Sequence, residues 1–466
     1  MLPSEPKIFH GRESEVSDIL DLLKAKTPRI AILGAGGMGK SSIARVLLHH
    51  PAITATYQQN RFFIGCGSTT TKLELVSLIG THIGLKLGKD PIQEVLKHLS
   101  NNPPSLLILD ELEMLWESAE SRGDIEELLS LLTDINHLAL MITMRGAERP
   151  AKVQWTRPFL LPLKPLDQKA ARLTFTDIAD DRHDLDEVDK ILSLTDNMPL
   201  AINLLAHLVD SEGCSNVLLR WEKEKTSVIS EGFDKRSNLN LSISLSLSSS
   251  RIKLLPQSQE LLSLLGMLPD GLSDVDLVQS KLPLKHPLKC KAVLMSTALA
   301  YSDENKQLKV LMPIREYIQQ YQRPEDQLVH TLLKHFQDLL HLFVQYLGTE
   351  SSPSTVRRIK SNFANIQNLL RWGLQGKHTH LLDNIRSVCH LNRFTRATNQ
   401  GSAHLIGEIQ HPLPHLGDQQ LQLYVITELL RLSNYPVHDP EALIARGLEY
   451  CEHIDDPKLK CMFNAQ

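Results

Sequence analysis

Cysteine pairs and long apolar runs are both missing from this sequence. Its six cysteines include no C-x-x-C pair, which argues against a disulfide framework or a zinc site and predicts free thiols in a reducing compartment. No run approaches the roughly 18 apolar residues that a membrane-spanning helix needs. The N-terminal stretch MLPSEPKIFHGRE also lacks a basic-then-apolar signal pattern. We therefore expect an intracellular, cytoplasmic protein without a membrane segment.

An excess of one charge is missing as well. The chain has 50 Lys and Arg against 54 Asp and Glu, a formal net charge of -4. This balance gives no electrostatic reason to expect nucleic acid, membrane or polyanionic partners. A chain of 466 residues, 42% of them hydrophobic, is too long for one core and predicts roughly two to four domains.

A glycine-rich loop with a lysine and a serine is the most specific motif in the sequence. Arg29 to Leu33 predicts a buried parallel strand, and Ser42 to Leu48 predicts a helix. Between them stands the G-x-x-x-x-G-K-S match Gly34-Ala35-Gly36-Gly37-Met38-Gly39-Lys40-Ser41. Strand, loop and helix in this order predict a phosphate-binding loop for ATP or ADP with magnesium.

The residues of this loop have separate predicted roles. The nucleotide-binding set is Gly34, Gly36, Gly37, Met38, Gly39, Lys40, Ser41 and Ser42. Glycines let successive backbone N–H groups face the phosphates. Lys40 would reach the β- and γ-phosphates, and the hydroxyl of Ser41 would coordinate magnesium.

A second apolar run ends in two acids. Leu106 to Leu109 is followed by Asp110 and Glu111, and ligands bind at the carboxyl ends of strands in open α/β sheets. Asp110 is predicted to hold the magnesium ion through water, and Glu111 to orient or deprotonate the attacking water. Acids that end a strand can also be solvated turn residues, an alternative that the P-loop makes much weaker for Asp110 than for Glu111.

Two more strands complete the predicted sheet. Leu138 to Thr143 leads to Arg145, which is predicted to sense the γ-phosphate; the alternative is a surface arginine. Arg61 to Cys66 lies between the P-loop and the acidic run. Cys66 is predicted to be a small core residue and not a nucleophile, because nothing nearby would activate it.

Taken in order, these motifs resemble those of the STAND-class signalling ATPases of the NB-ARC and NACHT kind, and more closely those of the fungal NOD-like receptors. The resemblance covers about Phe9 to Gln322. Phe9-His10-Gly11-Arg12-Glu13 looks like the family's hhGRE motif, whose backbone brackets the adenine, so the resemblance makes Phe9, His10, Gly11 and Arg12 nucleotide contacts. Asn197-Met198-Pro199-Leu200-Ala201 looks like the GxP motif, with Pro199 packing on the adenine.

The sequence departs from the family at three places. Asn197 replaces the usual glycine of the GxP motif, and Glu111 stands where relatives often have aspartate or asparagine. Relatives often carry Met-His-Asp near Leu311, with the histidine touching the ADP β-phosphate, but this chain has Pro313 there. Proline offers no donor, so the ADP lock must differ or be weaker, and Arg315 is the candidate substitute.

The resemblance and the helical patterns predict a multidomain fold of α/β and α parts. They predict a three-layer α/β P-loop domain over 1–164, a helical lid over 165–236, a winged helix over 237–323 and helical, tetratricopeptide-like repeats over 324–466. Asn238 to Ser248 alternates apolar and polar residues and by period alone is a strand. The resemblance implies a helix there, and we follow the resemblance.

Amphipathic spacing predicts the helices of the repeat region. The first begins at Gln327 and runs to Leu347, a breaker follows at Ser351 to Ser354, and further helices cover Phe363 to Trp372 and Pro440 to Tyr450. A clean period of roughly 34 residues is missing, so the likeness to tetratricopeptide repeats rests on the succession of amphipathic helices alone.

The function that the resemblance implies is a molecular switch in signal transduction, in fungal innate immunity or nonself recognition. ADP would hold the lids closed, and exchange for ATP, triggered through the repeats, would open the protein for self-oligomerisation or protein partners, with slow hydrolysis if any. Relatives usually carry an effector domain before the hhGRE motif; with Met1 eight residues ahead of Phe9, none is expected here.

Two other classes stay open. Glu111 and Arg145 are compatible with a steadily hydrolysing ATPase of the remodelling type. A winged helix is compatible with a transcription regulator, but Arg251 to Arg323 carries ten Lys/Arg against seven Asp/Glu, which is no basic stripe.

Overall fold

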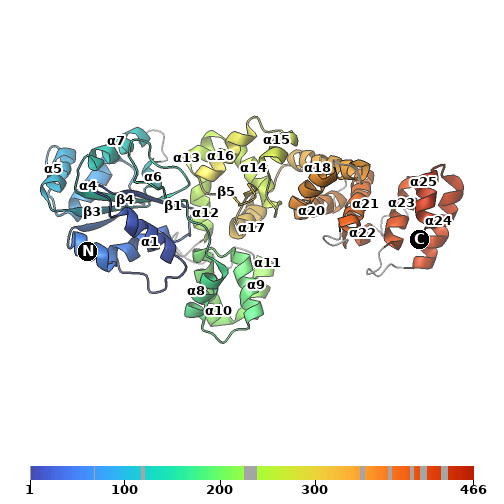
Figure 1. Cartoon of the computed structure of the whole chain (residues 1–466), viewed down its shortest axis with the longest axis horizontal. Helices are drawn as coiled ribbons and strands as arrows, with labels where there is room; N and C mark the ends of the chain where they lie inside the picture. The colour runs from blue at the N-terminus through green and yellow to red at the C-terminus, as the bar shows by residue number, and fades with distance from the viewer. Residues whose placement is uncertain are drawn as a thin grey trace. The chain divides into compact units, whose positions relative to one another are not determined.

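The computed structural model of the chain describes residues 2–67, 69–116, 121–224, 239–346, 352–375, 380–398, 404–409, 417–431 and 439–465 (Figure 1). The chain divides into two compact units. Unit 1 comprises Met1–Leu262, Lys289–Tyr301 and Val310–Gln322, and unit 2 comprises Ser263–Leu288, Ser302–Lys309 and Arg323–Gln466. This division differs from the four domains predicted from the sequence, whose boundaries stay predictions.

Unit 1 contains a four-stranded parallel sheet. Its strands are β1 (Arg29–Gly34), β2 (Arg61–Gly65), β3 (Ser105–Asp110) and β4 (Leu138–Arg145), in the order β1-β4-β3-β2. All four strands predicted from the sequence are confirmed. Because β4 separates β1 from β3, the P-loop strand and the strand that ends in Asp110 are two places apart. Every residue of β1 and of β3 is buried, which explains the apolar runs Ile30 to Leu33 and Leu106 to Leu109 within them.

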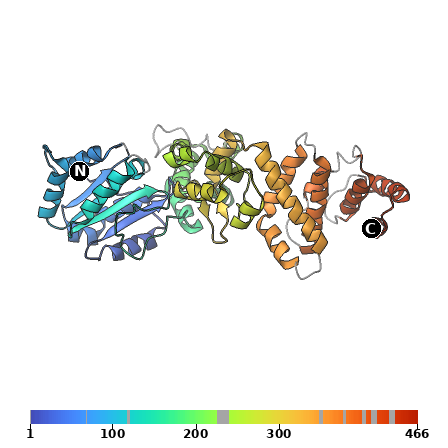
Figure 2. The ribbon, with the colours of Figure 1, turned by 90° about the horizontal axis from the view of Figure 1, so that it is seen from above.

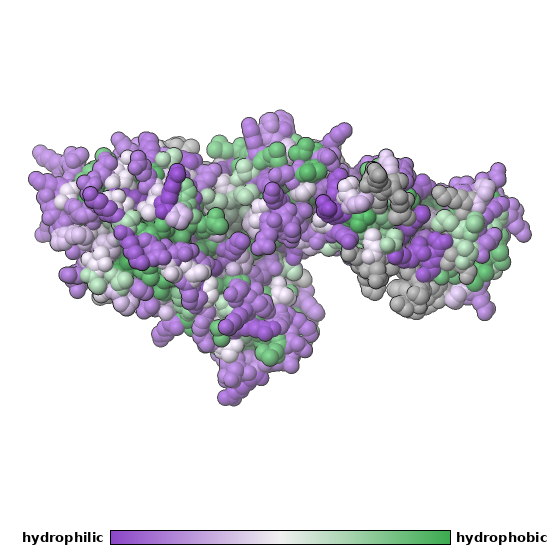
Figure 3. Space-filling view, viewed as in Figure 1, coloured by the Kyte–Doolittle hydropathy of each residue, from purple (hydrophilic) through white to green (hydrophobic). Residues whose placement is uncertain are grey.

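Helices cover both faces of this sheet (Figure 2). Alternate residues of β1 enter separate cores: Ala31 and Leu33 belong to one, Ile30 and Ile32 to the other, as the period of two in a strand requires. The first core includes residues of α4 (Lys72–His82), α5 (Pro91–Asn101) and α7 (Arg122–Thr133), and the second includes residues of α1 (Glu13–Leu22), α2 (Lys40–His49) and α3 (Pro51–Tyr57). Over α5 the outer surface is largely hydrophilic (Figure 3).

The rest of the chain is almost entirely helical. A short helix, α6 (Glu113–Trp116), lies between β3 and β4. After β4 come α8 (Gln168–Ala179), α9 (Leu185–Thr195), α10 (Pro199–Glu212), α11 (Cys214–Glu224), α12 (Leu239–Leu247) and α13 (Ser250–Leu254). They are followed by α14 (Gln257–Gly266), α15 (Asp274–Gln279), α16 (Pro287–Ser296), the two-residue strands β5 (Tyr301–Ser302) and β6 (Leu308–Lys309), and α17 (Met312–Tyr321).

The ambiguous Leu/Ser-rich segment is the helix α12, as the resemblance implied. Leu239, Ile243 and Leu247 are buried at steps of four residues, so the apolar positions that serve a strand also align on one helix face. Asn238, the first residue of the predicted segment, lies outside the described residues.

The region predicted to hold repeats, 324–466, is helical in its described parts. They are α18 (Asp326–Tyr346), α19 (Ser352–Ser361), α20 (Phe363–Gln375), α21 (Leu381–Thr398), α22 (His404–Glu408), α23 (Gln419–Leu430), α24 (Pro440–His453) and α25 (Pro457–Asn464). The three helices predicted there are confirmed, although Leu347 and Ser351 lie outside the described residues. Within the part of the chain that is described, every helix is too short or too polar to span a bilayer.

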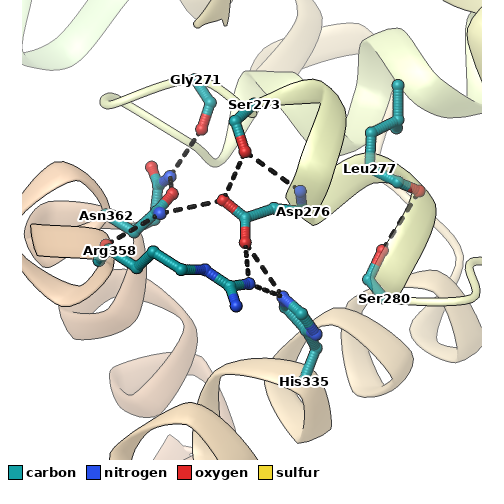
Figure 4. Close-up of polar contacts among 9 residues, drawn as sticks. Gly271, Ser273, Asp276, Leu277, Ser280, His335, Arg358 and Asn362 are labelled. Atoms are coloured by element: carbon teal, nitrogen blue, oxygen red, sulfur yellow. Dashed lines mark hydrogen bonds and ion pairs between the residues drawn. The ribbon is translucent and has the colours of Figure 1, made fainter. Parts of the chain in front are cut away.

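Within unit 2, a buried aspartate joins α15 to the first repeat helices (Figure 4). Oδ1 of Asp276 accepts from Nη2 of Arg358 at 2.6 Å and lies 3.1 Å from Nε2 of His335; Oδ2 accepts from Oγ of Ser273 at 2.7 Å and from Nδ2 of Asn362 at 3.1 Å. Burial alone would raise the pKa of Asp276, but the bonds from His335, Arg358 and Ser273 lower it well below its ordinary value. Asp276 is therefore ionised and fully bonded.

A second polar contact lies beside it. Oδ2 of Asp270 accepts from the backbone N–H of Ala364 at 2.7 Å and of Asn365 at 3.0 Å, and so satisfies two free donors in the first turn of α20. Nδ2 of Asn365 donates back to the carbonyl of Gly271 at 2.6 Å. Directional hydrogen bonds thus connect the α14–α15 loop to α20.

Replacing Asp276 by Ala should loosen this contact. The change removes the acceptor of the His335 ring and leaves the buried amide of Asn362 only the carbonyl of Arg358, while the Arg358 side chain, a third exposed, can turn to water. We expect a loss of roughly 2–3 kcal/mol, seen by hydrogen-exchange mass spectrometry as faster exchange in α15 and α19 but not in β3. Asp338→Ala, which removes an exposed partner of Lys334, is the matched control and should change nothing. Unchanged exchange in α15 would contradict the role of Asp276.

Candidate functional site

The glycine loop connects β1 to α2 as predicted. β1 ends at Gly34 and α2 begins at Lys40, with Gly39 as its N-terminal cap residue. Gly37 and Gly39 have φ of +80° and +88°, a left-handed backbone that other residues adopt only with strain. These two turns let the chain curl over the end of the sheet and place the N-terminus of α2 behind the loop.

Lys40 is held against the loop. Its Nζ donates to the carbonyl oxygens of Gly34 at 3.0 Å and Ala35 at 2.7 Å. Burial lowers the pKa of Lys40 to about 8, although the nearby carboxylate of Glu113 works in the opposite direction. The lysine is thus a desolvated cation whose charge an anion in the loop would stabilise.

Asp110 ends β3 and contacts the start of α2. It is completely buried, and its Oδ1 accepts from Oγ of Ser41 at 2.7 Å and from Oγ1 of Thr143 at 2.5 Å. Oδ2 is buried without a hydrogen-bond partner among the described residues. A buried carboxylate oxygen with no donor is unfavourable unless a cation or water meets it. The pair Ser41 and Asp110 therefore fits a magnesium ion, which takes few protein ligands besides phosphate and water.

Glu111 and Arg145 stand at the ends of β3 and β4. Glu111 has a φ of +62°, and its backbone N–H donates to Oγ1 of Thr143 at 3.0 Å. Nε of Arg145 lies 3.2 Å from Oε1 of Glu113, and Nη1 donates to Oγ of Ser246 in α12 at 3.0 Å. The arginine thus joins the site to a helix 100 residues further along the chain.

A pocket of about 300 Å³ brings most of the predicted residues together. Of the predicted set, it is lined by Gly36, Gly37, Gly39, Lys40, Ser41, Ser42, Glu111, Arg145 and Pro199. Sequence reasoning missed Ile8, Arg45, Glu113, Thr174, Leu200 and Asn203, which also line it. Glu113 had a signal in the sequence, since it follows Asp110 by three residues in the run LLILDELE; the others are ordinary residues of helices or of an extended segment.

The start of α10 packs directly on the P-loop. Pro199 is the first residue of α10, and the N–H of Leu200 donates to the carbonyl of Gly37 at 3.1 Å. Asn197 has a φ of +55°, so the asparagine found where the family has glycine adopts a left-handed backbone that asparagine tolerates well. The departure noted in the sequence therefore leaves the turn before Pro199 intact.

The hhGRE-like segment supports the loop from outside the pocket. Nη2 of Arg12 donates to the carbonyls of Met38 at 3.2 Å and Lys164 at 2.6 Å. Nε2 of His10 lies 2.7 Å from Oδ2 of Asp177 in α8. A Cβ on Gly11 would lie 2.3 Å from that of Ala170.

None of Phe9, His10, Gly11 and Arg12 is among the described residues that line the pocket, and neither are Gly34, Met38 and Asp110. Phe9 packs against the core beside α2. The nearest lining residue of this segment is Ile8. Nucleotide contact by these residues stays a prediction.

Arg315 lies in α17 and contacts a neighbour in the same helix. Its Nη2 is 2.6 Å from Sδ of Met312, whose backbone N–H in turn donates to Asp196. It is not among the described residues lining the pocket, so its role as a substitute lock stays a prediction.

Cys66 is a fully buried core residue as predicted, and burial raises the pKa of its thiol.

Comparison with known proteins gives a family match for the N-terminal part. Residues 2–174 match the family model described as Novel STAND NTPase 1. No curated protein matches the chain. The match confirms the STAND resemblance for the P-loop region; the NB-ARC subtype and the fungal receptor type stay predictions.

Three solved structures are similar to parts of the chain. A Walker-type ATPase of Pyrococcus abyssi shares 12% identity, with 68% of this chain and 98% of that one covered and a TM-score of 0.49. A STAND protein with a tetratricopeptide repeat sensor from Pyrococcus horikoshii shares 15%, with 99% and 67% covered and a TM-score of 0.32. The Orc1 protein of Aeropyrum pernix, solved with DNA, shares 16%, with 70% and 95% covered and a TM-score of 0.36. Sequence identities and TM-scores as low as these say nothing of what this chain binds.

Gly37→Ala should lower stability more than Gly39→Ala. Both residues have a left-handed φ, so both changes cost about 1–2 kcal/mol in backbone strain. A Cβ on Gly37 would also lie 2.9 Å from Cβ of Leu200, whereas nothing lies within 4 Å of a Cβ on Gly39. We expect the first variant to be less stable than the second by roughly 1–3 kcal/mol, measured by thermal unfolding without nucleotide. Equal losses would contradict the close packing of α10 on the loop.

Proposed function

We propose that this protein binds ATP or ADP with Mg²⁺ in the P-loop pocket and acts as a nucleotide-controlled switch in signal transduction. The observation that carries the proposal is the arrangement around Asp110. One oxygen of this buried carboxylate accepts from Ser41, the other has no donor among the described residues, and the glycine loop next to Ser41 holds a buried lysine. Desolvated cation, free carboxylate oxygen and exposed backbone N–H groups together suit a magnesium–phosphate group.

Each residue then has a defined task. Backbone N–H groups of the loop and the N-terminus of α2 attract the phosphates. Lys40 exchanges its two carbonyl acceptors for phosphate oxygens. Ser41 and Asp110 would hold the magnesium ion, Asp110 through water, and the ion when bound neutralises charge on the phosphates.

The switch itself rests on contacts between the pocket and the lids. Arg145 pairs with Glu113 and also reaches Ser246 of α12. A γ-phosphate would compete with Glu113 for the guanidinium, so ATP and ADP would act differently on the Arg145–Ser246 contact. A nucleotide shifts a conformational equilibrium only by its differential affinity for the two states. ADP would favour the closed state, and ATP an open state that meets protein partners or further copies of the chain.

Steady ATP hydrolysis is a second candidate, because Glu111 and Glu113 both border the pocket and either carboxylate could orient a water. Turnover near or above about one per second would favour a working ATPase. Much slower turnover would favour the switch.

The test is to purify the protein, denature it, and identify and count the nucleotide released. We expect about one ADP per chain, or an empty protein that takes up ADP with magnesium. Lys40→Ala should bind at least roughly tenfold more weakly, because it removes a charged partner of the phosphates. Unchanged affinity in that variant would show that the nucleotide site has been assigned wrongly.

Asp110→Asn should remove most of the gain in affinity that magnesium provides, roughly tenfold or more, because the amide is a weaker partner for the ion. Calorimetric titration of ADP with magnesium and with a chelator separates the two contributions. Binding in chelator should stay within about twofold of the unchanged protein. Glu111→Gln is the matched control, for which magnesium should keep its effect; loss of binding in chelator would indicate misfolding of the Asn variant.

A further inference from the structure

Arg45 is a pocket residue to which the motifs assign no role. It lies on α2, four residues beyond Ser41 and three beyond Ser42, so all three side chains share one face of the helix. It borders the 300 Å³ pocket together with these two serines. Its guanidinium carbon lies 5.9 Å from the ring centroid of Phe63 in β2, a cation–π distance that holds the stem on that side of the site.

Arg45 differs from the other two cationic side chains of the pocket in the partners of its charged group. Lys40 donates to two carbonyl oxygens, and Arg145 pairs with Glu113. Among the described residues, Arg45 has no carboxylate within ion-pair distance, and its Nε is buried without a hydrogen-bond partner. A half-buried guanidinium with an unmet donor is costly unless an anion meets it.

The chemistry of the pocket decides which anion this is. The glycine loop and the N-terminus of α2 favour phosphate, and a guanidinium binds phosphate oxygens through two parallel N–H groups. Glu113 is already engaged with Arg145, and Asp110, whose Oδ2 has no hydrogen-bond partner among the described residues, is assigned to the magnesium ion by the proposed function.

We propose that Arg45 binds the phosphate chain of the nucleotide from the side of α2 and makes the pocket select phosphorylated nucleotides over the nucleoside. This inference rests on the proposed function. Arg45 is then a specificity-determining residue: it adds affinity for each ligand that carries a diphosphate and none for adenosine. The competing role is purely structural, a support for Phe63, and would affect all ligands alike.

The experiment compares the unchanged protein with Arg45→Met, which keeps the length of the side chain and removes its charge. Calorimetric titration with ADP, adenosine and inorganic pyrophosphate is the measurement. ADP and pyrophosphate should each bind roughly tenfold more weakly, while adenosine should bind equally well. Arg45→Lys, which keeps the charge but not the two parallel N–H groups, should recover only part of the loss. Arg182→Met, a change at an exposed residue, is the control and should alter nothing.

The remaining outcomes separate this inference from the proposed function. Equal loss for ADP and adenosine, or no loss for either anion, overturns the role of Arg45 and leaves the nucleotide site standing. An unchanged protein that binds pyrophosphate but not ADP overturns the nucleotide function, and a weaker pyrophosphate response of Arg45→Met then still supports the anion contact. Binding of neither ligand overturns both. If Arg45→Met does not fold, Arg45→Gln takes its place in the same comparison.

Discussion

The site depends above all on one buried carboxylate. Asp110 ends a strand that is fully enclosed, and its charge must be compensated in place. One oxygen is met by two hydroxyl groups, from Ser41 at the start of α2 and Thr143 in β4. Since β4 lies between the P-loop strand and the Asp110 strand, this single oxygen fixes three elements against one another. The other oxygen has no donor among the described residues, which leaves the site suited to a cation.

Around that carboxylate, the pocket is built by close approach of distant segments. Gly37 has no side chain and a left-handed φ, so the backbone of Leu200 comes within hydrogen-bond distance of its carbonyl. Arg12 reaches from the N-terminal segment to the carbonyl of Met38, and Arg145 reaches from β4 to α12. The first two contacts join the loop to α10 and to the segment before α1, and the third joins β4 to α12. The surroundings of the pocket are therefore built from parts of unit 1 that lie far apart in the chain.

In unit 2, hydrogen bonds and ion pairs of two aspartates join the helices. Asp276 and Asp270 bind α18, α19 and α20 through bonds of fixed direction. Breaking one partner of such a network costs more than loss of a comparable apolar contact, because a buried donor or acceptor is left unmet. The directions of these bonds therefore restrict how α18, α19 and α20 pack against α15 and the loop before it.

Local patterns in the sequence are enough to predict the P-loop, its strand and helix, the acidic strand end and the helical character of the second half. These follow from local patterns: an apolar run needs a buried strand, and Gly-rich backbone followed by Lys-Ser needs a helix N-terminus behind it. Tertiary structure alone decided that Glu113 pairs with Arg145, that Arg45 and Asn203 border the pocket, and that Arg12 supports Met38 instead of lining the pocket. It also decided that Asp276 is the centre of a network. Such pairings join residues far apart in the chain, and no period or motif records which side chains meet when the chain folds.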